Sequence, residues 1–443
     1  FKFDKLKMKK IEKNKKIVYV NLVGDDLNDG HKNILKIASR YGEVVVGLMT
    51  DKASLEYTSL PHFSYKERES FLKKNRLIKK ILPQDALDFT KNLRKLKPNF
   101  VIHGDDWKKG YQKKIRLRVI KELKKWSGRL IEVKYTPNIP ISEDNSKFLR
   151  HSTTAEIRKL KLKRLLSSKK IVKILEAHNP IGGLLIDTMS YNDPKKYDQI
   201  DGAWCSSLTD STSRGKPDNG SLDLTTRANW LSEMFEVSAK PVIFDADNGG
   251  PTEHLKFLVN KLEKIGVSAV VIEDKVGVKI NSLFKDQSKT KQDSISSFCK
   301  KIKIMCNSRV SDDFLIISRI ESLILGKGVK AALKRANAYS KAGADLILIH
   351  SNKSDTKEIF QFAREFKKSK FFKPMVAVPS AYPTVREKEL IDNGFKIVIY
   401  ANHLLRTSYL SMQNTIFSIL KNGRAYEAQK DMISIKKIIQ LIK

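Results

Sequence analysis

Residues 241–274 read PVIFDADNGGPTEHLKFLVNKLEKIGVSAVVIED, and this stretch decides the fold. Two apolar runs, at 241–247 and 268–274, end in acidic residues, and a helical pattern closed by a glycine lies between them. A strand, a helix and a second strand in this order are typical of a parallel βαβ unit. The stretch therefore predicts a parallel sheet whose strands end in polar residues at one edge.

The same alternation extends through the second part of the chain. Apolar runs occur at 183–187, 202–205, 241–247, 268–274, 314–320, 345–350, 374–379 and 396–401. Helical patterns, such as residues 329–343, separate several of them, and a basic amphipathic helix is expected at 158–175. Eight strands in a length near the roughly 250 residues typical of the fold predict a (β/α)₈ barrel of the TIM type.

The first part of the chain has an alternation of its own. Strands are predicted at 16–24, 43–51 and 99–105, and an amphipathic helix at 114–126, which indicates a separate, Rossmann-like α/β domain. The polar segment 138–156 contains Pro140 and is typical of a connection. We predict one domain over residues 1–140, a linker over 141–156 and the barrel over 157–443.

Composition limits the partners. The formal net charge is +36 at pH 7, but the lysines are spread along the chain without interleaved aromatic residues, which disfavours nucleic acid and favours small anionic substrates. No apolar stretch approaches the roughly 20 residues of a membrane helix. The three cysteines form no ligand pattern, and so sparse a set is typical of a cytoplasmic protein.

Polar residues that could carry chemistry follow the predicted barrel strands. In a barrel, the carboxyl ends of all strands face one mouth. Each residue alone has an ordinary explanation, a helix cap for an aspartate or an interior position for a histidine. Together they are harder to explain, because clustered buried carboxylates are costly unless a cation neutralises them. The residues are Trp204, Ser206, Asp245, Asp247, Glu273, Arg319 and His350.

The residue types indicate the ligands. Oxygen donors such as Asp245, Asp247 and Glu273 favour a hard cation, Mg²⁺, that keeps several waters. Arg319 and His350 would supply donors for a phosphate or carboxylate. After Glu273 the chain reads DKVGVKINSL, a polar stretch that we expect to form a mobile loop over the mouth.

Five segments carry a specific resemblance. GAWCSSLTDSTSRGKPD, FDADNGG, IEDKVGVKINSL, SRIESLILGKG and LIHS, in this order, resemble the phosphoenolpyruvate mutase family of the isocitrate lyase superfamily, over roughly residues 157–443. The pattern EDK-x₃-K-x-NS resembles the gating loop of the mutases. Lyases of the superfamily place a catalytic cysteine there, whereas this chain has Lys279, Ile280 and Asn281 and no cysteine between 206 and 298.

The resemblance implies a reaction and roles. The family interconverts phosphoenolpyruvate and phosphonopyruvate, the first step of phosphonate biosynthesis, with Mg²⁺ near Asp245 and, through water, near Asp247 and Glu273. Relatives with this barrel usually form homotetramers by exchanging a C-terminal helix. Phosphonopyruvate hydrolase is the enzyme alternative, and Asn281 favours the mutase. The implied catalytic residues are Ser206, Asp218 (as nucleophile or orienting group), Lys279, Asn281, Arg319 and His350, and the implied substrate-binding residues are Trp204, Ser207 and Ser282.

The first domain carries a second resemblance. GDDLNDGHKNIL (24–35) resembles the His-x-Gly-His signature of cytidylyltransferases, with Asn28 in place of the first histidine and Gly30 and His31 retained. The later phosphate motif is represented only by PISEDNSKF (140–148). Asparagine cannot carry a positive charge, so the resemblance implies a nucleotidyltransferase fold with weak nucleotide binding and lost or altered catalysis. Residual nucleotidyltransferase activity and a binding or scaffold role are the alternatives.

Overall fold

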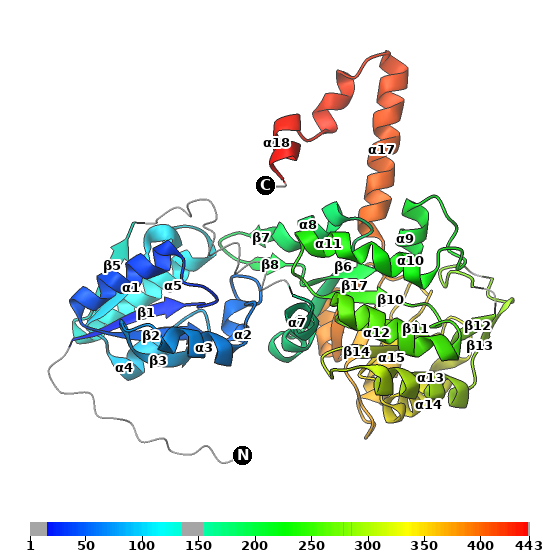
Figure 1. The fold of residues 1–443 in the computed structure, drawn as a ribbon, viewed down its shortest axis with the longest axis horizontal. Coiled ribbons are helices and arrows are strands. Elements are labelled where there is room, and N and C mark those ends of the chain that lie inside the picture. The colour runs from blue at the N-terminus through cyan, green and yellow to red at the C-terminus, as the bar shows by residue number, and fades with distance from the viewer. Residues whose placement is uncertain (1–15, 135–153, 278, 285, 442–443) are drawn as a thin grey trace.

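The computed structural model describes residues 16–134, 154–277, 279–284 and 286–441. Figure 1 shows an N-terminal sheet domain and a barrel, with helix α7 (Ala155–Ser168) between them. Of the predicted linker, residues 141–153 lie outside the described residues, and α7 begins within its last two positions.

The N-terminal domain is a doubly wound parallel sheet. Its strands are β1 (Ile17–Leu22), β2 (Glu43–Met49), β3 (Ile78–Gln84), β4 (Phe100–Gly104) and β5 (Arg129–Val133), in the order β3-β2-β1-β4-β5. Apolar clusters cover both faces, under α1 (Asp29–Tyr41), α3 (Tyr65–Lys73), α4 (Thr90–Leu96) and α5 (Lys113–Leu123). The predicted Rossmann-like fold is confirmed. The sequence missed β3, an edge strand with two lysines and a proline, which is a composition that edge strands tolerate.

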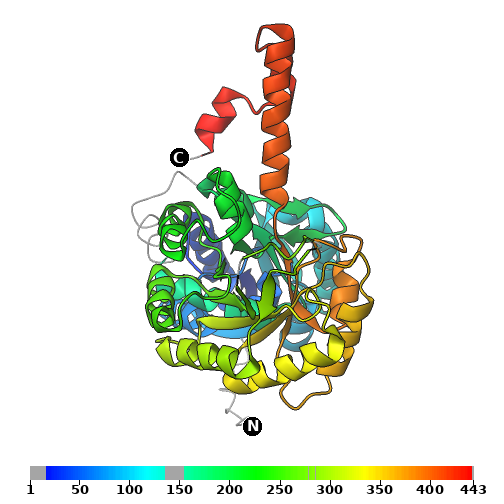
Figure 2. The same cartoon turned by 90° about the vertical axis from the view of Figure 1, so that its right-hand side faces the viewer.

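The second domain is a closed ring of eight parallel strands, as predicted. The strands are β6 (Val172–Glu176), β9 (Gly202–Cys205), β10 (Val242–Asp245), β11 (Ala269–Glu273), β14 (Leu315–Ile320), β15 (Leu346–Ile349), β16 (Met375–Ala377) and β17 (Phe395–Tyr400). Helices surround the ring in Figure 2. Among them, α12 (Leu255–Ile265), α13 (Ile295–Ser308), α14 (Gly328–Ala342) and α15 (Lys357–Phe366) follow β10, β11, β14 and β15.

Two predicted elements at the start of the barrel are wrong. The helix expected at 158–175 ends at Ser168, and its last residues form β6, the true first strand. The run 183–187, predicted as a strand, lies inside α8 (Pro180–Thr188). This helix is capped by Asn179, whose side chain accepts a hydrogen bond from the Gly182 N–H. A short apolar run does not by itself distinguish a strand from a buried helix, and the cap and Pro180 decide for the helix.

Helix α7 packs against both domains. Its Leu162 and Leu165 join the apolar cluster inside the barrel, to which Leu60 of the first domain also belongs. Arg164 binds both carboxylate oxygens of Asp51 at 2.9 Å. Its guanidinium also donates to the carbonyls of residues 62 and 63 at 2.9 Å. The two domains are therefore joined by a buried, charge-assisted contact as well as by the chain.

A long helix follows β17, the last strand of the barrel. Helix α17 (His403–Asn422) projects away from the ring and is followed by α18 (Ile435–Gln440), as both views show. None of the residues of α17 is buried. No helix in the described part of the chain has the length and apolar character needed to cross a membrane.

Candidate active site

All twelve residues that the sequence predicted for the barrel site line one cavity at the mouth. They come from the ends of β9, β10, β11, β14 and β15 and from the segments that follow these strands. The set is Trp204, Ser206, Ser207, Asp218, Asp245, Asp247, Glu273, Lys279, Asn281, Ser282, Arg319 and His350. The structure thus brings the predicted residues together, whereas their individual roles stay predictions.

The acidic side of the mouth is held by the backbone. Asp245 is the last residue of β10, and its carboxylate accepts hydrogen bonds from the Ser207 hydroxyl at 3.0 Å and the Asp247 N–H at 3.2 Å. Asp247 has a φ of 52°, and its carbonyl accepts the N–H of Glu273 at 2.7 Å. A non-glycine residue at positive φ is strained, and such strain clusters at functional sites. The bond to Glu273 fixes the two strand ends relative to each other.

A lysine and an asparagine hold Asp218. Lys279 Nζ lies 2.5 Å from Asp218 Oδ1 and 2.9 Å from Asp247 Oδ1. Asn281 Nδ2 donates to Asp218 Oδ2 at 2.8 Å. Asp218 follows α9 (Ser207–Ser213), whereas Lys279 and Asn281 lie outside helix and strand, between β12 (Lys275–Gly277) and β13 (Thr290–Gln292). The segment after β11 therefore contacts Asp218 at the mouth, whereas its role as a gating loop stays a prediction.

The basic side of the mouth is centred on Arg319 of β14. Its Nη2 lies 2.9 Å from His350 Nδ1, 2.9 Å from Ser282 Oγ and 3.3 Å from Glu273 Oε2. Its Nε donates to Glu321 Oε1 at 2.6 Å. The guanidinium is thus fixed in position by two carboxylates and has little freedom to reorient.

The charges shift one another's protonation. Burial raises the pKa of Glu273 to about 8, and the nearby Glu321 and Asp247 carboxylates act in the same direction. Burial and the Asp245 carboxylate raise the pKa of Asp247. Burial and the Arg319 guanidinium lower the pKa of His350, so the imidazole is neutral. A cation bound between the carboxylates would stabilise their charged forms and would therefore lower both pKa values.

The donor set fits a hydrated hard cation. Asp245, Asp247 and Glu273 offer only oxygen atoms to the cavity, and carboxylate oxygens are the ligands that Mg²⁺ prefers. Among the described residues, no three His, Cys, Asp or Glu side chains form a preformed metal cage. A cation at this place would therefore keep water between itself and part of the set, as Mg²⁺ commonly does.

Three charged residues of the site were missed by the sequence reasoning. Glu321, fully buried, binds Arg319 and also accepts from Ser282 Oγ at 2.5 Å. Lys275 Nζ donates to the same Ser282 oxygen at 2.8 Å. Arg227 donates to the Asp245 carbonyl at 2.6 Å and lies 3.7 Å from the Asp247 carboxylate. The spacing Arg-x-Glu in SRIES and the lysine of the EDK pattern were available as signals, whereas nothing in the sequence marks Arg227.

The N-terminal domain has a separate cavity that contains the three predicted nucleotide-binding residues. Asn28, Gly30 and His31 line it, together with His103 of the neighbouring strand β4. The Asn28 side chain, however, caps α1 by accepting the His31 N–H at 2.9 Å. Burial lowers the pKa of His31, so this imidazole is neutral as well. The segment 140–148, predicted as the second phosphate motif, lies outside the described residues.

The barrel and the N-terminal domain match different families. The family model for phosphoenolpyruvate phosphomutase matches residues 162–420, and that for cytidylyltransferase-like domains matches residues 25–174. A phosphoenolpyruvate phosphomutase of Tetrahymena pyriformis is 32% identical over 281 residues, 63% of this chain and 89% of that protein. A phosphonopyruvate hydrolase of Variovorax sp. (strain Pal2) is 32% identical over 282 residues, again 63% of this chain and 93% of the relative.

Solved structures show the same two kinds of relative. The crystal structure of a phosphoenolpyruvate phosphomutase from Streptomyces platensis subsp. rosaceus matches with a TM-score of 0.58 and 32% identity, covering 65% of this chain and 94% of that one. A phosphonopyruvate hydrolase in complex with oxalate and Mg²⁺ matches with a TM-score of 0.57 and 30% identity, covering 64% and 94%.

Proposed function

The chain belongs to the phosphoenolpyruvate phosphomutase family, and we propose that its barrel interconverts phosphoenolpyruvate and phosphonopyruvate. The observation that carries this proposal is the position of Asp218. Its two carboxylate oxygens are held by Lys279 and Asn281 at the mouth. A carboxylate oriented in this way can receive, or guide, a phosphoryl group that moves within one substrate molecule.

The basic side of the mouth would bind the phosphoryl oxygens. His350 Nδ1 lies 2.9 Å from Arg319 Nη2 and 3.1 Å from Glu321 Oε1, so the imidazole is held beside the guanidinium. His350 and Arg319 would each supply a donor for phosphoryl oxygen, and Ser206 and Asn281 would add two more. Trp204, Ser207 and Ser282 would line the substrate.

The acidic side would hold Mg²⁺. We assign Asp245 as the nearest carboxylate, with Asp247 and Glu273 acting through water, as the family resemblance implies, and all three line the cavity. When bound, the ion would supply a positive charge that stabilises an enolate. Lys279 and Asn281 must withdraw from Asp218 for substrate to enter, so the segment that carries them acts as the gate expected from the sequence.

Phosphonopyruvate hydrolase is the second candidate, because a relative with that name is 32% identical over 282 residues. The asparagine at position 281 supports the mutase, because the loop around it resembles that of the mutases. The test is ³¹P NMR of the full chain with phosphonopyruvate and Mg²⁺. The phosphoenolpyruvate resonance is expected and should disappear with a chelator. Inorganic phosphate as the main product would establish the hydrolase instead.

For the N-terminal domain we propose a retained fold that binds nucleotide weakly and transfers cytidylyl groups poorly. Asn28 stands where the resembling enzymes carry a histidine, and its side chain is engaged as a helix cap. His31 and Gly30 remain at the cavity, so some affinity for a nucleotide phosphate is expected. Calorimetric titration of CTP into the full chain would measure it.

We also propose that the protein is a cytoplasmic homotetramer that acts in phosphonate biosynthesis. Helix α17 exposes a row of large apolar side chains, namely Tyr409, Leu410, Met412, Ile416, Phe417 and Leu420. An isolated helix of this kind gains little stability without packing, and a second copy of the chain would supply it. The three cysteines are free thiols, in agreement with a reducing compartment. Analytical ultracentrifugation would test the assembly.

A further inference from the structure

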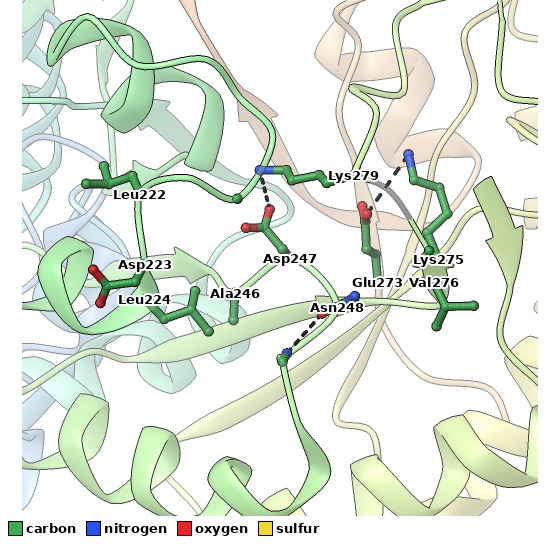
Figure 3. Close-up of a pocket in the computed structure, with 13 residues that line it drawn as sticks. Leu222, Asp223, Leu224, Ala246, Asp247, Asn248, Glu273, Lys275, Val276 and Lys279 are labelled. Carbon is green, nitrogen blue, oxygen red and sulfur yellow. Dashed lines mark hydrogen bonds and ion pairs between the residues drawn. The ribbon is translucent and has the colours of Figure 1, made fainter. Parts of the chain in front are cut away.

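The start of helix α17 forms part of the wall of the mouth cavity. Figure 3 shows Asp247, Glu273 and Lys279, which line this cavity on the side of β10 and β11. Ala401 and Asn402, which directly precede α17, line the same cavity. They follow β17, which is the fourth strand from β11 in either direction around the ring. The start of α17 therefore lies across the mouth from the acidic end of β11.

The contacts at its base decide where α17 points, because none of its 20 residues is buried. The first four N–H groups of any helix have no partner within the helix and need an acceptor from elsewhere. Within the described part of the chain, the Asn402 side chain makes no capping hydrogen bond to α17, and the first turn has no acidic residue. The helix therefore depends on an acceptor from another element.

Glu176, the last residue of β6, supplies that acceptor. Its Oε2 accepts the N–H groups of Leu404 at 3.0 Å and Leu405 at 3.2 Å, the second and third residues of α17. These are the positions whose N–H groups an N-cap side chain normally binds. The other oxygen, Oε1, lies 2.5 Å from His178 Nδ1. The Glu176 side chain is fully buried, so its carboxylate joins the imidazole to the helix without competition from water.

The same strand holds the chain on both sides of the cavity wall. Strand β17 pairs with β6 as far as Tyr400, and Glu176 of β6 binds the chain again at Leu404. Ala401 and Asn402 lie between these two attachments. A buried carboxylate without partners would be costly, whereas at a helix N-terminus the N–H groups and the helix dipole stabilise it. The position of Glu176 is therefore favourable for the carboxylate and restrictive for the chain.

We propose that Glu176 is a positioning residue for the barrel reaction, because by binding the start of α17 it holds Ala401 and Asn402 in place as a wall of the mouth. The proposal rests on the proposed mutase function and adds to it a residue that does not itself line the cavity. Loss of the contact loosens this wall. Substrate binding should then weaken more than the chemical step slows, because the assigned metal carboxylates belong to β10, β11 and the turn after β10.

The test compares three replacements of Glu176 in the full chain. Glu176→Gln loses the charge but keeps an acceptor oxygen for α17 and gains a donor for His178. Glu176→Asp keeps the charge but is shorter by one methylene group, and Glu176→Ala removes the contact. Initial rates of phosphoenolpyruvate formation from phosphonopyruvate with Mg²⁺ give KM, which does not depend on how much of the protein is folded. We expect KM to rise at least about tenfold in the Glu176→Asp and Glu176→Ala variants, with a smaller change in kcat, and to stay near wild type in Glu176→Gln.

Hydrogen exchange measures the contact without turnover. Amide exchange in peptides that cover the start of α17, followed by mass spectrometry, should be at least about tenfold faster in Glu176→Asp and Glu176→Ala, and close to wild type in Glu176→Gln. The matched control is Asn179→Ala, which removes the cap of the neighbouring helix α8 and does not line the mouth. This variant should keep the wild-type KM and the wild-type exchange at α17.

Several results would overturn the proposal. One is an unchanged KM in Glu176→Ala, and another is a Glu176→Gln variant as impaired as Glu176→Ala. A rise of KM in Asn179→Ala, or a failure of both Glu176→Asp and Glu176→Ala to fold, would also overturn it, because the effect would then be one of general stability. If wild type forms no phosphoenolpyruvate, the proposed function itself fails. Hydrogen exchange and calorimetric titration of oxalate with Mg²⁺, the pair bound in the related hydrolase structure, then replace KM as the measurement.

Discussion

The polar side chains at the mouth of the barrel and those in the N-terminal cavity have different kinds of partner. At the mouth, Asp218, Asp247 and Glu273 are met by the side chains of Lys279 and Arg319 from other segments. In the N-terminal cavity, Asn28 is bonded to the helix that it begins. Side chains held by distant partners can exchange those partners for a ligand, whereas a side chain that caps its own helix cannot do so without loosening the helix. We therefore expect the mouth to exchange its contacts for a ligand more readily than the N-terminal cavity does.

The sharpest test of the mouth is Asp218→Ala. Turnover of phosphonopyruvate should fall by more than about 10³-fold, since even one electrostatic contact to a transition state is worth about 10²–10³. Binding of Mn²⁺, followed by electron paramagnetic resonance, should change little because Asp218 is not one of the assigned metal carboxylates. A variant that keeps nearly the wild-type rate would remove Asp218 from the mechanism and with it the contrast between the two cavities.

Replacing Arg227 tests how much the buried ion pair next to Asp245 contributes to stability. Arg227→Leu leaves the buried Asp210 carboxylate, which Arg227 binds at 3.0 Å, without its guanidinium. Removing one partner of a buried pair should lower the free energy of unfolding by about 3–5 kcal/mol. Urea unfolding measures this. The matched control is Lys388→Met, because its pair with Asp392 is exposed and should contribute no more than about 1 kcal/mol. If the free energy of unfolding falls equally in the two variants, the buried pair contributes no more than the exposed one.

The N-terminal cavity is tested by restoring an imidazole. Wild type should release pyrophosphate from CTP, with phosphate or phosphonate acceptors, far more slowly than an ordinary enzyme rate of about 1 s⁻¹. Asn28→His should raise that rate by up to about 10²–10³-fold, the usual contribution of one such donor. It should also cost about 1 kcal/mol of stability, because the cap of α1 is lost. Fast turnover by the wild type would show that both cavities are catalytic.

The contact between the two regions predicts a pH-dependent effect on stability. Burial lowers the pKa of Lys161 on α7 to about 7, from 10.5 in the unfolded chain. Below pH 7 Lys161 is protonated in both the folded and the unfolded chain, so the folded state carries the full free-energy cost of burying the charge. Between pH 7 and 10.5 the unfolded state binds more protons, so stability should rise by up to about 1.4 kcal/mol per pH unit. Urea unfolding of Lys161→Met should lack this rise, whereas exposed Lys163→Met should keep it.

Strand ends were predictable from the sequence because they combine two signals. Asp245 and Glu273 each close an apolar run, and parallel strands bring such ends to one edge. Glu321 was missed because it lies just beyond the end of β14 and a glutamate there is ordinary at a surface. Arg227 was missed because its importance comes from contacts with Asp210 and Asp245, which the chain assembles only in three dimensions. The misassigned run 183–187 is a different case, because Asn179 and Pro180 just before it are local signals for the start of a helix.

Helix α7 has a consequence for how this chain could be divided or recombined. The helix contacts both domains: Arg164 binds the Asp51 carboxylate of the first domain, and Leu165 packs in the apolar cluster of the barrel. A cut at the linker would leave Asp51 on one fragment and its partner Arg164 on the other. An exchange of the first domain for that of a relative would have to carry a matching surface for α7. The two domains therefore depend on one shared surface, although their folds are separate.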